Sequence, residues 1–163
     1  MNQGKILVVD DDSQMRASLT HLLESAGYSV AVAGDGAEGL MALQANQPDA
    51  ILSDVRMPGM NGLEFQTKVR DIGSVPVVLI SAHGDIPMAV GALQDGAYSF
   101  VEKPFGPRRL LGILKNAVRM KRLLDNTEML QDRLVELANL ERVLIGNSPH
   151  IIATRDQIFD FAA

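Results

Sequence analysis

Residues 6–11 read ILVVDD, four consecutive aliphatic side chains followed directly by two carboxylates. A short apolar run without alternation is typical of a strand buried on both faces of a parallel sheet. A similar run, VVLI, occupies residues 77–80. Because a turn signal and a stretch with helical spacing follow each run, the sequence predicts repeated strand–helix units.

Five such units can be traced along the first 120 residues. The expected strands are Ile6–Val9, Ser29–Ala33, Ala50–Leu52, Val77–Ile80 and Tyr98–Val101. The expected helices between them are Ser13–Ala26, Ala37–Gln44, Gly62–Val69 and Pro87–Gln94, with Gly27, Gly73 and Gly96 in C-cap positions. This alternation predicts an α/β fold, a flavodoxin-like (βα)5 doubly wound parallel sheet of strand order 2-1-3-4-5.

The composition limits the class of protein. The chain has 163 residues, of which 47% are hydrophobic, and no cysteine, so disulfides and thiolate metal sites are excluded. No apolar run reaches the roughly 20 residues that span a bilayer, and no secretory signal is recognisable, so we expect a cytoplasmic protein without a membrane partner. Residues 1–106 carry 6 basic and 13 acidic side chains, which argues against direct nucleic-acid binding.

A long helical segment follows the five units. Residues 108–144 contain no proline and one glycine, Gly112. The a and d positions of one heptad register hold Ile113, Asn116, Met120, Leu123, Thr127, Leu130, Leu134 and Leu137. We expect the fifth helix to run on as a coiled-coil linker that joins two copies in a homodimer. A single amphipathic helix lying on its own domain is the alternative.

Three carboxylates are expected to converge at one edge of the sheet. Asp10 and Asp11 follow the first strand, and Asp54 follows the third. The carboxyl ends of parallel strands meet at the same edge, where such folds hold their ligands. Close carboxylates repel one another and call for a cation, and oxygen ligands with retained waters suit Mg²⁺. Asp12 is expected to cap the next helix instead of joining the cluster.

Ser81 and Lys103 follow the fourth and fifth strands, which places a hydroxyl and an ammonium at the same edge. A phosphoryl group on Asp54 would offer one oxygen to the metal, one to Lys103 and one to Ser81. Such an electrostatic clamp is what phosphoryl transfer needs, with Asp54 as the nucleophile.

The segments that carry this chemistry are ILVVDD (6–11), SDVRMPGMNG (53–62), ISA (80–82) and KPF (103–105). They resemble the motifs of two-component response-regulator receiver domains, and the receiver is expected to span residues 1–120.

The resemblance implies that Asp54 accepts a phosphoryl group from a sensor histidine kinase. It also implies that Mg²⁺ is held by Asp10, Asp11, Asp54 and the backbone carbonyl of Arg56.

The same resemblance implies roles for four further residues. Ser81 and Lys103 would contact the phosphoryl group, and the Lys103–Pro104 peptide bond would be cis. Phe100 matches the aromatic residue that turns inward on activation, although packing in the core is its alternative role. His83 would tune the loss of phosphate rather than take part in the chemistry.

Residues 81–98, SAHGDIPMAVGALQDGAY, resemble receivers of sigma-54-dependent activators of the nitrogen regulatory protein C class, especially C4-dicarboxylate transport regulators. Residues 144–149, LIGNSP, resemble the opening of the ATPase domain of those activators, so 145–163 would be the start of a truncated ATPase domain or a disordered tail. The chain carries neither a phosphate-binding Gly-x4-Gly-Lys loop nor a helix-turn-helix. It is therefore expected to be no enzyme, and to lack the downstream ATPase and DNA-binding domains.

Three alternatives stay open. A stand-alone single-domain receiver would share the site, but the heptad segment argues against it. An aspartyl-phosphate phosphatase would use Asp-x-Asp after the first strand, yet residues 10–14 read DDDSQ and Asp54 would have no role. A flavin carrier would need a Ser/Thr/Gly-rich loop there and aromatic rings, whereas this loop is acidic and the chain has no tryptophan.

Overall fold

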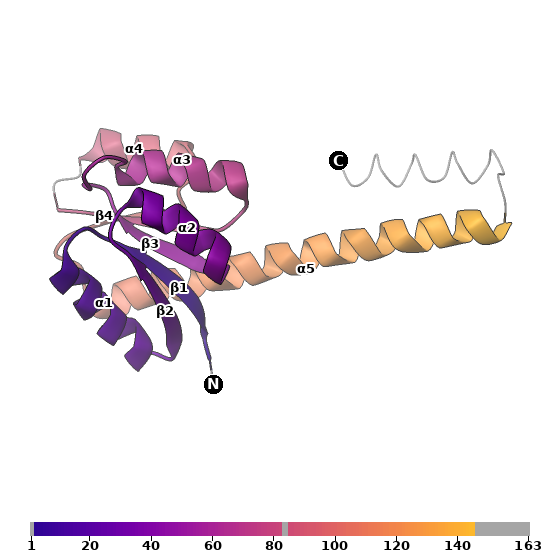
Figure 1. The fold of residues 1–163 in the computed structure, drawn as a ribbon, viewed down its shortest axis with the longest axis horizontal. Coiled ribbons are helices and arrows are strands. Elements are labelled where there is room, and N and C mark those ends of the chain that lie inside the picture. Colours follow the sequence, from indigo (N-terminus) through magenta and orange to yellow (C-terminus); the bar gives the residue numbers. More distant parts are fainter. Residues whose placement is uncertain (1, 83–84, 146–163) are drawn as a thin grey trace. The chain divides into compact units, whose positions relative to one another are not determined.

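Strands and helices alternate along the described part of the chain (Figure 1). The structure, a computed structural model, describes residues 2–82 and 85–145. Its elements are β1 (Gly4–Val9), α1 (Ser13–Ser25), β2 (Tyr28–Ala33), α2 (Gly36–Asn46), β3 (Ala50–Asp54), α3 (Gly62–Ile72), β4 (Val77–Ser81), α4 (Ile86–Gln94), β5 (Ser99–Glu102) and α5 (Pro107–Ile145). All five expected strands are present, with ends that differ by one or two residues.

The five strands form one parallel sheet in the order β2-β1-β3-β4-β5, which confirms the predicted topology. β1 and β3 each have a neighbour on both sides, and the apolar residues of the run 6–9 are fully buried. β2 lies at the edge, where its end residues Tyr28 and Ala33 are buried, the residues between them are not, and Val32 is half exposed. The absence of alternation in residues 6–9 therefore indicated a central strand correctly.

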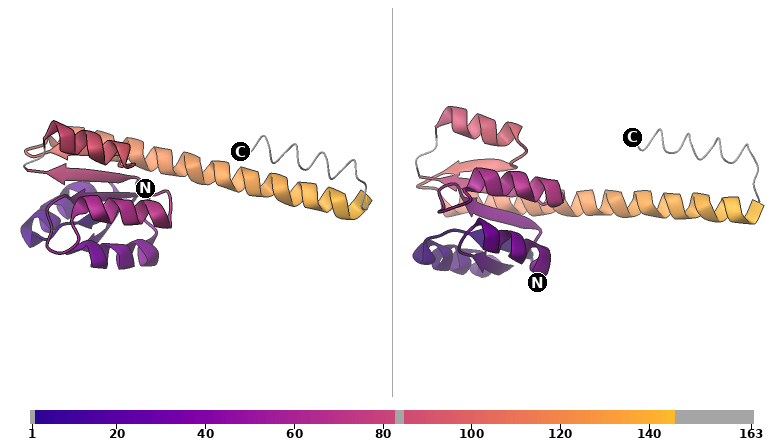
Figure 2. Two further views of the ribbon diagram at one scale, coloured as in Figure 1. Left: turned by 90° about the horizontal axis from the view of Figure 1, so that it is seen from above. Right: turned by 45° about the horizontal axis from the view of Figure 1, so that its top comes forward.

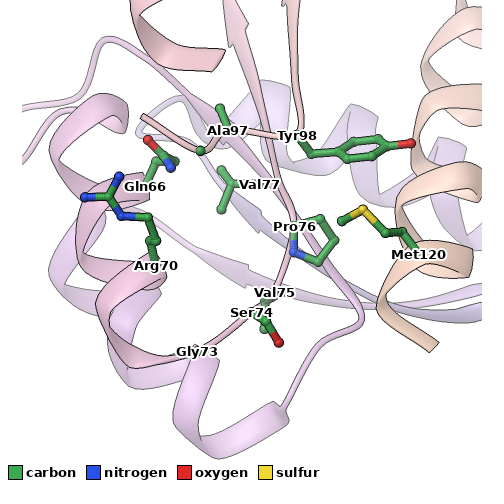
Figure 3. Close-up of a pocket in the computed structure, with 11 residues that line it drawn as sticks. Gln66, Arg70, Gly73, Ser74, Val75, Pro76, Val77, Ala97, Tyr98 and Met120 are labelled. Carbon is green, nitrogen blue, oxygen red and sulfur yellow. The ribbon is translucent and has the colours of Figure 1, made fainter. Parts of the chain in front are cut away.

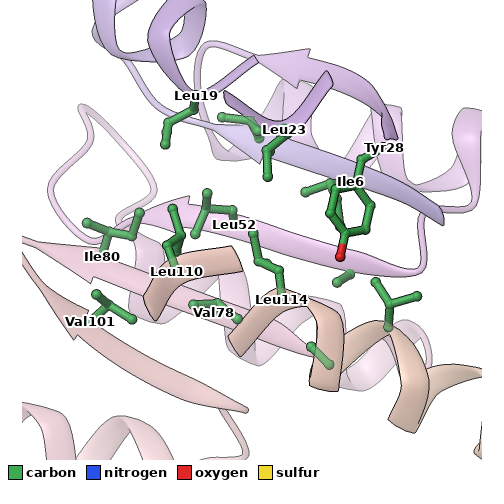
Figure 4. Packing of buried hydrophobic residues seen from close by; sticks show 14 residues of the cluster. Ile6, Leu19, Leu23, Tyr28, Leu52, Val78, Ile80, Val101, Leu110 and Leu114 are labelled. Atoms are coloured by element: carbon green, nitrogen blue, oxygen red, sulfur yellow. The ribbon is translucent and has the colours of Figure 1, made fainter. Parts of the chain in front are cut away.

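Helices cover both faces of the sheet (Figures 1 and 2). On one face α1 and the start of α5 enclose a core, in which Leu19 and Leu23 from α1 meet Leu110 and Leu114 from α5 (Figure 4). On the other face α2, α3 and α4 enclose a second core around Phe65, which is fully buried. The two cores hold the sheet rigidly from both sides, so the loops at its edges are presented from a fixed base.

Side-chain caps begin the first four helices. Asp12 accepts hydrogen bonds from the backbone N–H groups of Gln14 and Met15, as expected for an N-cap. Asp35, Asn61 and Asp85 begin α2, α3 and α4 in the same way.

The three glycines expected at helix ends lie at the ends of α1, α3 and α4. Gly27 and Gly96 have φ of 97° and 107°, which a glycine adopts without strain. Gly73 is the C-cap residue of α3, as predicted, and has an extended backbone with φ −174°.

The chain divides into two compact units, one ending at Arg122 and one beginning at Leu123, and α5 contributes to both. In the first unit, Ile113 of the heptad register packs partly against the domain core. In the second, the heptad leucines are exposed, and pairing with a second copy stays a prediction. No described helix is long and apolar enough to cross a membrane. The expected ATPase start or tail was placed at 145–163; Ile145 is the last residue of α5, and residues 146–163 lie outside the described residues.

Candidate functional site

The carboxyl ends of β1, β3, β4 and β5 bring the chemical groups of the sequence prediction to one edge. Asp54 and Ser81 are the last residues of β3 and β4, rather than the first residues after them. The sheet continues to these positions because Asp54 is the register partner of Ile80, and Ser81 that of Glu102. The backbone N–H of Lys103 donates to the carbonyl of Ser81 at 2.9 Å, which fixes Lys103 beside the end of β4.

The carboxylates of Asp10, Asp11 and Asp54 form a cluster whose nearest oxygens all lie within 4.8 Å of one another. Asp10 is 3% exposed and accepts a hydrogen bond from the backbone N–H of Asp12 at 2.9 Å. The ammonium of Lys103 lies 3.7 Å from Asp54 Oδ1. One lysine therefore faces three carboxylates, and the edge keeps an excess of negative charge.

The surroundings of the cluster disfavour ionisation of two of its members. Burial raises the pKa of the Asp54 carboxyl above its ordinary value, and the charge of Asp11 adds to the rise, whereas Lys103 opposes it. Burial also raises the pKa of Asp10, with a contribution from the charge of Asp54, against the backbone hydrogen bond from Asp12. A bound cation would remove the repulsive part of both shifts.

The loop after β3 is held against Asp54 by a close backbone contact. A Cβ atom on Gly62 would lie 2.3 Å from the carbonyl oxygen of Asp54, so only glycine fits there. The N–H of Gly62 also donates to the carbonyl of Val55 at 2.8 Å. Gly59, with φ 74°, turns the chain in between. The loop that carries Arg56 is thus packed directly beside the acidic cluster.

A hollow of about 510 Å³ adjoins the cluster and is lined by Asp11, Arg56 and Met88, among others. The carboxylates on one side of it are hard oxygen donors in an acidic, partly exposed setting, which is the donor chemistry that Mg²⁺ takes while keeping several waters. The residues present therefore fit that ion.

Several predicted residues lie elsewhere or did not stand out in the sequence. Phe100 lies in the middle of β5, beside Leu79, and packs against the second core rather than at the acidic edge. His83 lies outside the described residues. The sequence prediction missed Gly62 as a packing residue, and also missed Arg16, whose guanidinium donates to the backbone carbonyl of Asp10 at 2.7 Å. A basic residue one turn into the helix after an acidic loop is a signal that could have identified Arg16. The Lys103–Pro104 bond is cis, as predicted.

A parallel sheet of this order, with three carboxylates and a lysine at its carboxyl edge, defines the class of signalling switch domains. Residues 6–115 match the response regulator receiver domain, and the chain belongs to that family.

Individual proteins support the same assignment. The C4-dicarboxylate transport transcriptional regulatory protein DctD of Pseudomonas aeruginosa is 36% identical over 162 residues, which cover 99% of this chain and 35% of that protein. The transcriptional regulatory protein FixJ of Bradyrhizobium diazoefficiens is 39% identical over 161 residues, 93% of this chain and 78% of FixJ. The crystal structure of NtrX from Brucella abortus superposes with a TM-score of 0.72 at 32% identity, covering 78% of this chain and 30% of NtrX.

These findings confirm the resemblance to C4-dicarboxylate transport regulators, and they leave the phosphatase and flavin-carrier alternatives without support. The chain spans about a third of the length of DctD.

Proposed function

We propose that this chain is a phosphorelay switch in which Asp54 accepts a phosphoryl group from a sensor histidine kinase. The observation that carries the proposal is the geometry of the carboxyl edge: three carboxylates within 4.8 Å, and the Lys103 ammonium 3.7 Å from Asp54 Oδ1. The switch is a regulatory domain rather than an enzyme. We expect the protein to act in the cytoplasm.

In the transfer step, a carboxylate oxygen of Asp54 forms a bond to phosphorus while the bond from phosphorus to the kinase histidine nitrogen breaks. The electron pair of the broken bond stays on the imidazole. The ammonium of Lys103 neutralises charge on the phosphoryl oxygens, and the hydroxyl of Ser81 donates a hydrogen bond to one of them, since both residues stand at the carboxyl ends of neighbouring strands. Asp10, Asp11, Asp54 and the carbonyl of Arg56 would hold Mg²⁺, which when bound would supply positive charge to balance these acidic groups and the incoming phosphoryl oxygens.

We expect the conformational change that follows phosphorylation to pass through β4, β5 and the helices beside them. Ser81 is the last residue of β4, and Leu79 of β4 is the register neighbour of Phe100 in β5. A displacement of Ser81 toward the phosphoryl group would therefore be transmitted to β5, the strand that carries Phe100. α5 follows β5 after a short loop and continues into the heptad segment. A homodimer through residues 108–144 would pass this change to downstream domains, which in sigma-54-type activators are an ATPase and a DNA-binding domain. The similarity to DctD supports this part of the proposal.

The test is intact-mass spectrometry after incubation with acetyl phosphate, with and without magnesium. The wild type is expected to gain one phosphoryl group only when magnesium is present, and the Asp54→Asn variant is expected to gain none. Asp71→Asn, at an exposed aspartate of α3, is the matched control and should behave like the wild type. A phosphorylated Asp54→Asn, or an unmodified wild type, would show that Asp54 is not the acceptor.

A further inference from the structure

Arg16 reaches from α1 to the strand end that carries the acidic cluster. Its Nη1 donates to the backbone carbonyl of Asp10 at 2.7 Å, across six residues of sequence. Hydrogen bonds from a guanidinium are stronger than those between neutral groups, and 2.7 Å lies at the short end of their range. Arg16 therefore ties the first turn of α1 to the end of β1.

The backbone of Asp10 is held from two sides. Its N–H donates to the carbonyl of Ala33 at 3.1 Å, on the neighbouring strand β2, and its carbonyl accepts from Arg16. Its carboxylate in turn accepts the N–H of Asp12. These contacts set the direction in which the Asp10 carboxylate leaves the strand.

The guanidinium of Arg16 lies next to the loop between β2 and α2. A Cβ atom on Gly34 would lie 3.4 Å from Arg16 Nη1 and 3.3 Å from Glu38 Oε2. Glu38 Oε2 already accepts the N–H of Gly34 at 2.7 Å. The loop between β2 and α2 therefore closes one side of the Arg16 side chain, and the carbonyl of Asp10 lies on the other.

We propose that Arg16 is a positioning residue that holds Asp10, and with it the carboxylate cluster, in the arrangement that binds Mg²⁺. Three carboxylates within 4.8 Å repel one another, so a loop without this tie relaxes outward and separates them. Arg16 touches neither the metal nor the phosphoryl group and acts through the main chain of Asp10. This inference rests on the proposed phosphorylation switch and assigns one residue that controls its metal dependence.

Arg70 supplies a matched control at the opposite end of the sheet. Its guanidinium also donates to a backbone carbonyl, that of Asp95, and lines a hollow of about 330 Å³ next to the amino ends of β4 and β5 (Figure 3). The Gln66 amide donates to the same carbonyl. Arg16→Met and Arg70→Met therefore remove the same kind of contact, once beside the cluster and once far from it.

The experiment measures the magnesium concentration that gives half-maximal phosphorylation by acetyl phosphate, together with direct binding of Mg²⁺ by calorimetry and the melting temperature. For Arg16→Met, we expect the magnesium midpoint to rise about tenfold, the factor to which a lost contact of about 1.4 kcal/mol corresponds, with a phosphorylation rate at saturating magnesium near that of the wild type. Arg70→Met should leave the midpoint unchanged, and Arg16→Lys should restore part of the affinity.

Equal midpoints for Arg16→Met and Arg70→Met, with lower melting temperatures for both, would overturn the proposal and leave Arg16 a purely structural contact. If Arg16→Met does not fold, Arg16→Gln carries the same two outcomes. A wild type that binds Mg²⁺ but is not phosphorylated would contradict the proposed switch and not the role of Arg16, because calorimetry reads the metal site without the transfer.

Discussion

The two parts of α5 contain apolar residues at helical spacing, but their surroundings differ. In residues 107–122, Leu110, Leu114 and Ala117 are 0% exposed, because α1 and the sheet enclose them. In residues 123–145, Leu130 is 61% and Leu137 is 60% exposed. One helix thus begins as part of a finished core and continues as an apolar seam that nothing in the described chain covers. Helical periodicity alone does not distinguish these two situations.

The difference shows what each unit of the chain lacks. The first unit has a complete core but keeps three close carboxylates against one lysine at its edge. In the described part of the second unit, residues 123–145, the helix exposes leucines that a soluble helix normally buries. In the first unit, a cation would balance the charge of the carboxylates and allow a phosphoryl group to bind. In the second, a helix of another copy would cover the exposed leucines.

The largest expected effect comes from truncating the buried part of α5. Leu114→Ala should lower the free energy of unfolding by about 2–5 kcal/mol, because it removes buried methyl groups and leaves a cavity. Leu137→Ala removes the same atoms from an exposed position and should change this free energy by less than about 0.5 kcal/mol while the chain is monomeric. Urea unfolding of both variants at low protein concentration measures the contrast. Similar losses for the two leucines would mean that the second part of α5 is packed as firmly as the first.

Association of two copies gives the next effect in size. Leu130→Ala, at a d position, should weaken the dimer about 100-fold or more, because the dimer loses one leucine from each copy and burial of each leucine contributes at least about 1.5 kcal/mol. Met129 is almost equally exposed, at 59%, but lies outside the a and d positions, so Met129→Ala is the matched control and should leave the dimer intact. Sedimentation equilibrium over a range of concentrations gives both dissociation constants. Equal weakening by the two substitutions would exclude the predicted heptad seam.

Some features of the fold and the site could be predicted from the sequence because they depend on local patterns. Residues 6–9 and 77–80 predicted central strands because burial on both faces leaves no polar position. The alternation of elements predicted a doubly wound sheet, and the order 2-1-3-4-5 is a common one in that class. The carboxylates of Asp10 and Asp54 were predicted to meet because parallel strands end at one edge. Each of these inferences needs only a local pattern and a general rule of topology.

Other features had no local pattern to reveal them. α2 ends at Asn46 and is capped by Gln47, which adopts a left-handed φ of 48° where the sequence offers no glycine, so the end of the helix was placed too early. The contact of Arg16 with the carbonyl of Asp10 joins a long flexible side chain to a main-chain atom. Every residue has such a carbonyl, so the sequence does not indicate which one the arginine would contact. Gly62 stood in a recognised motif, but its close approach to the Asp54 backbone is visible only in three dimensions.

The smallest expected effect concerns the charged edge of the first unit. The pKa values of Asp10 and Asp54 are raised in the folded state, chiefly by burial, so the folded chain retains protons at pH values where the unfolded chain has lost them. The stability that this retention provides is complete below the ordinary carboxyl pKa of 3.8 and is lost as the pH rises through the raised folded values.

In the absence of divalent metal, the free energy of unfolding should therefore fall less steeply over this window in Asp54→Asn than in the wild type. Asp71→Asn, at an exposed aspartate, should follow the wild type. Urea unfolding at a series of pH values in the presence of a chelator measures the three slopes. Added magnesium should stabilise the wild type most at neutral pH, where the carboxylates of the acidic edge are ionised and repel one another. A wild type and an Asp54→Asn variant with the same pH dependence would mean that burial does not raise the pKa of Asp54 in the folded chain.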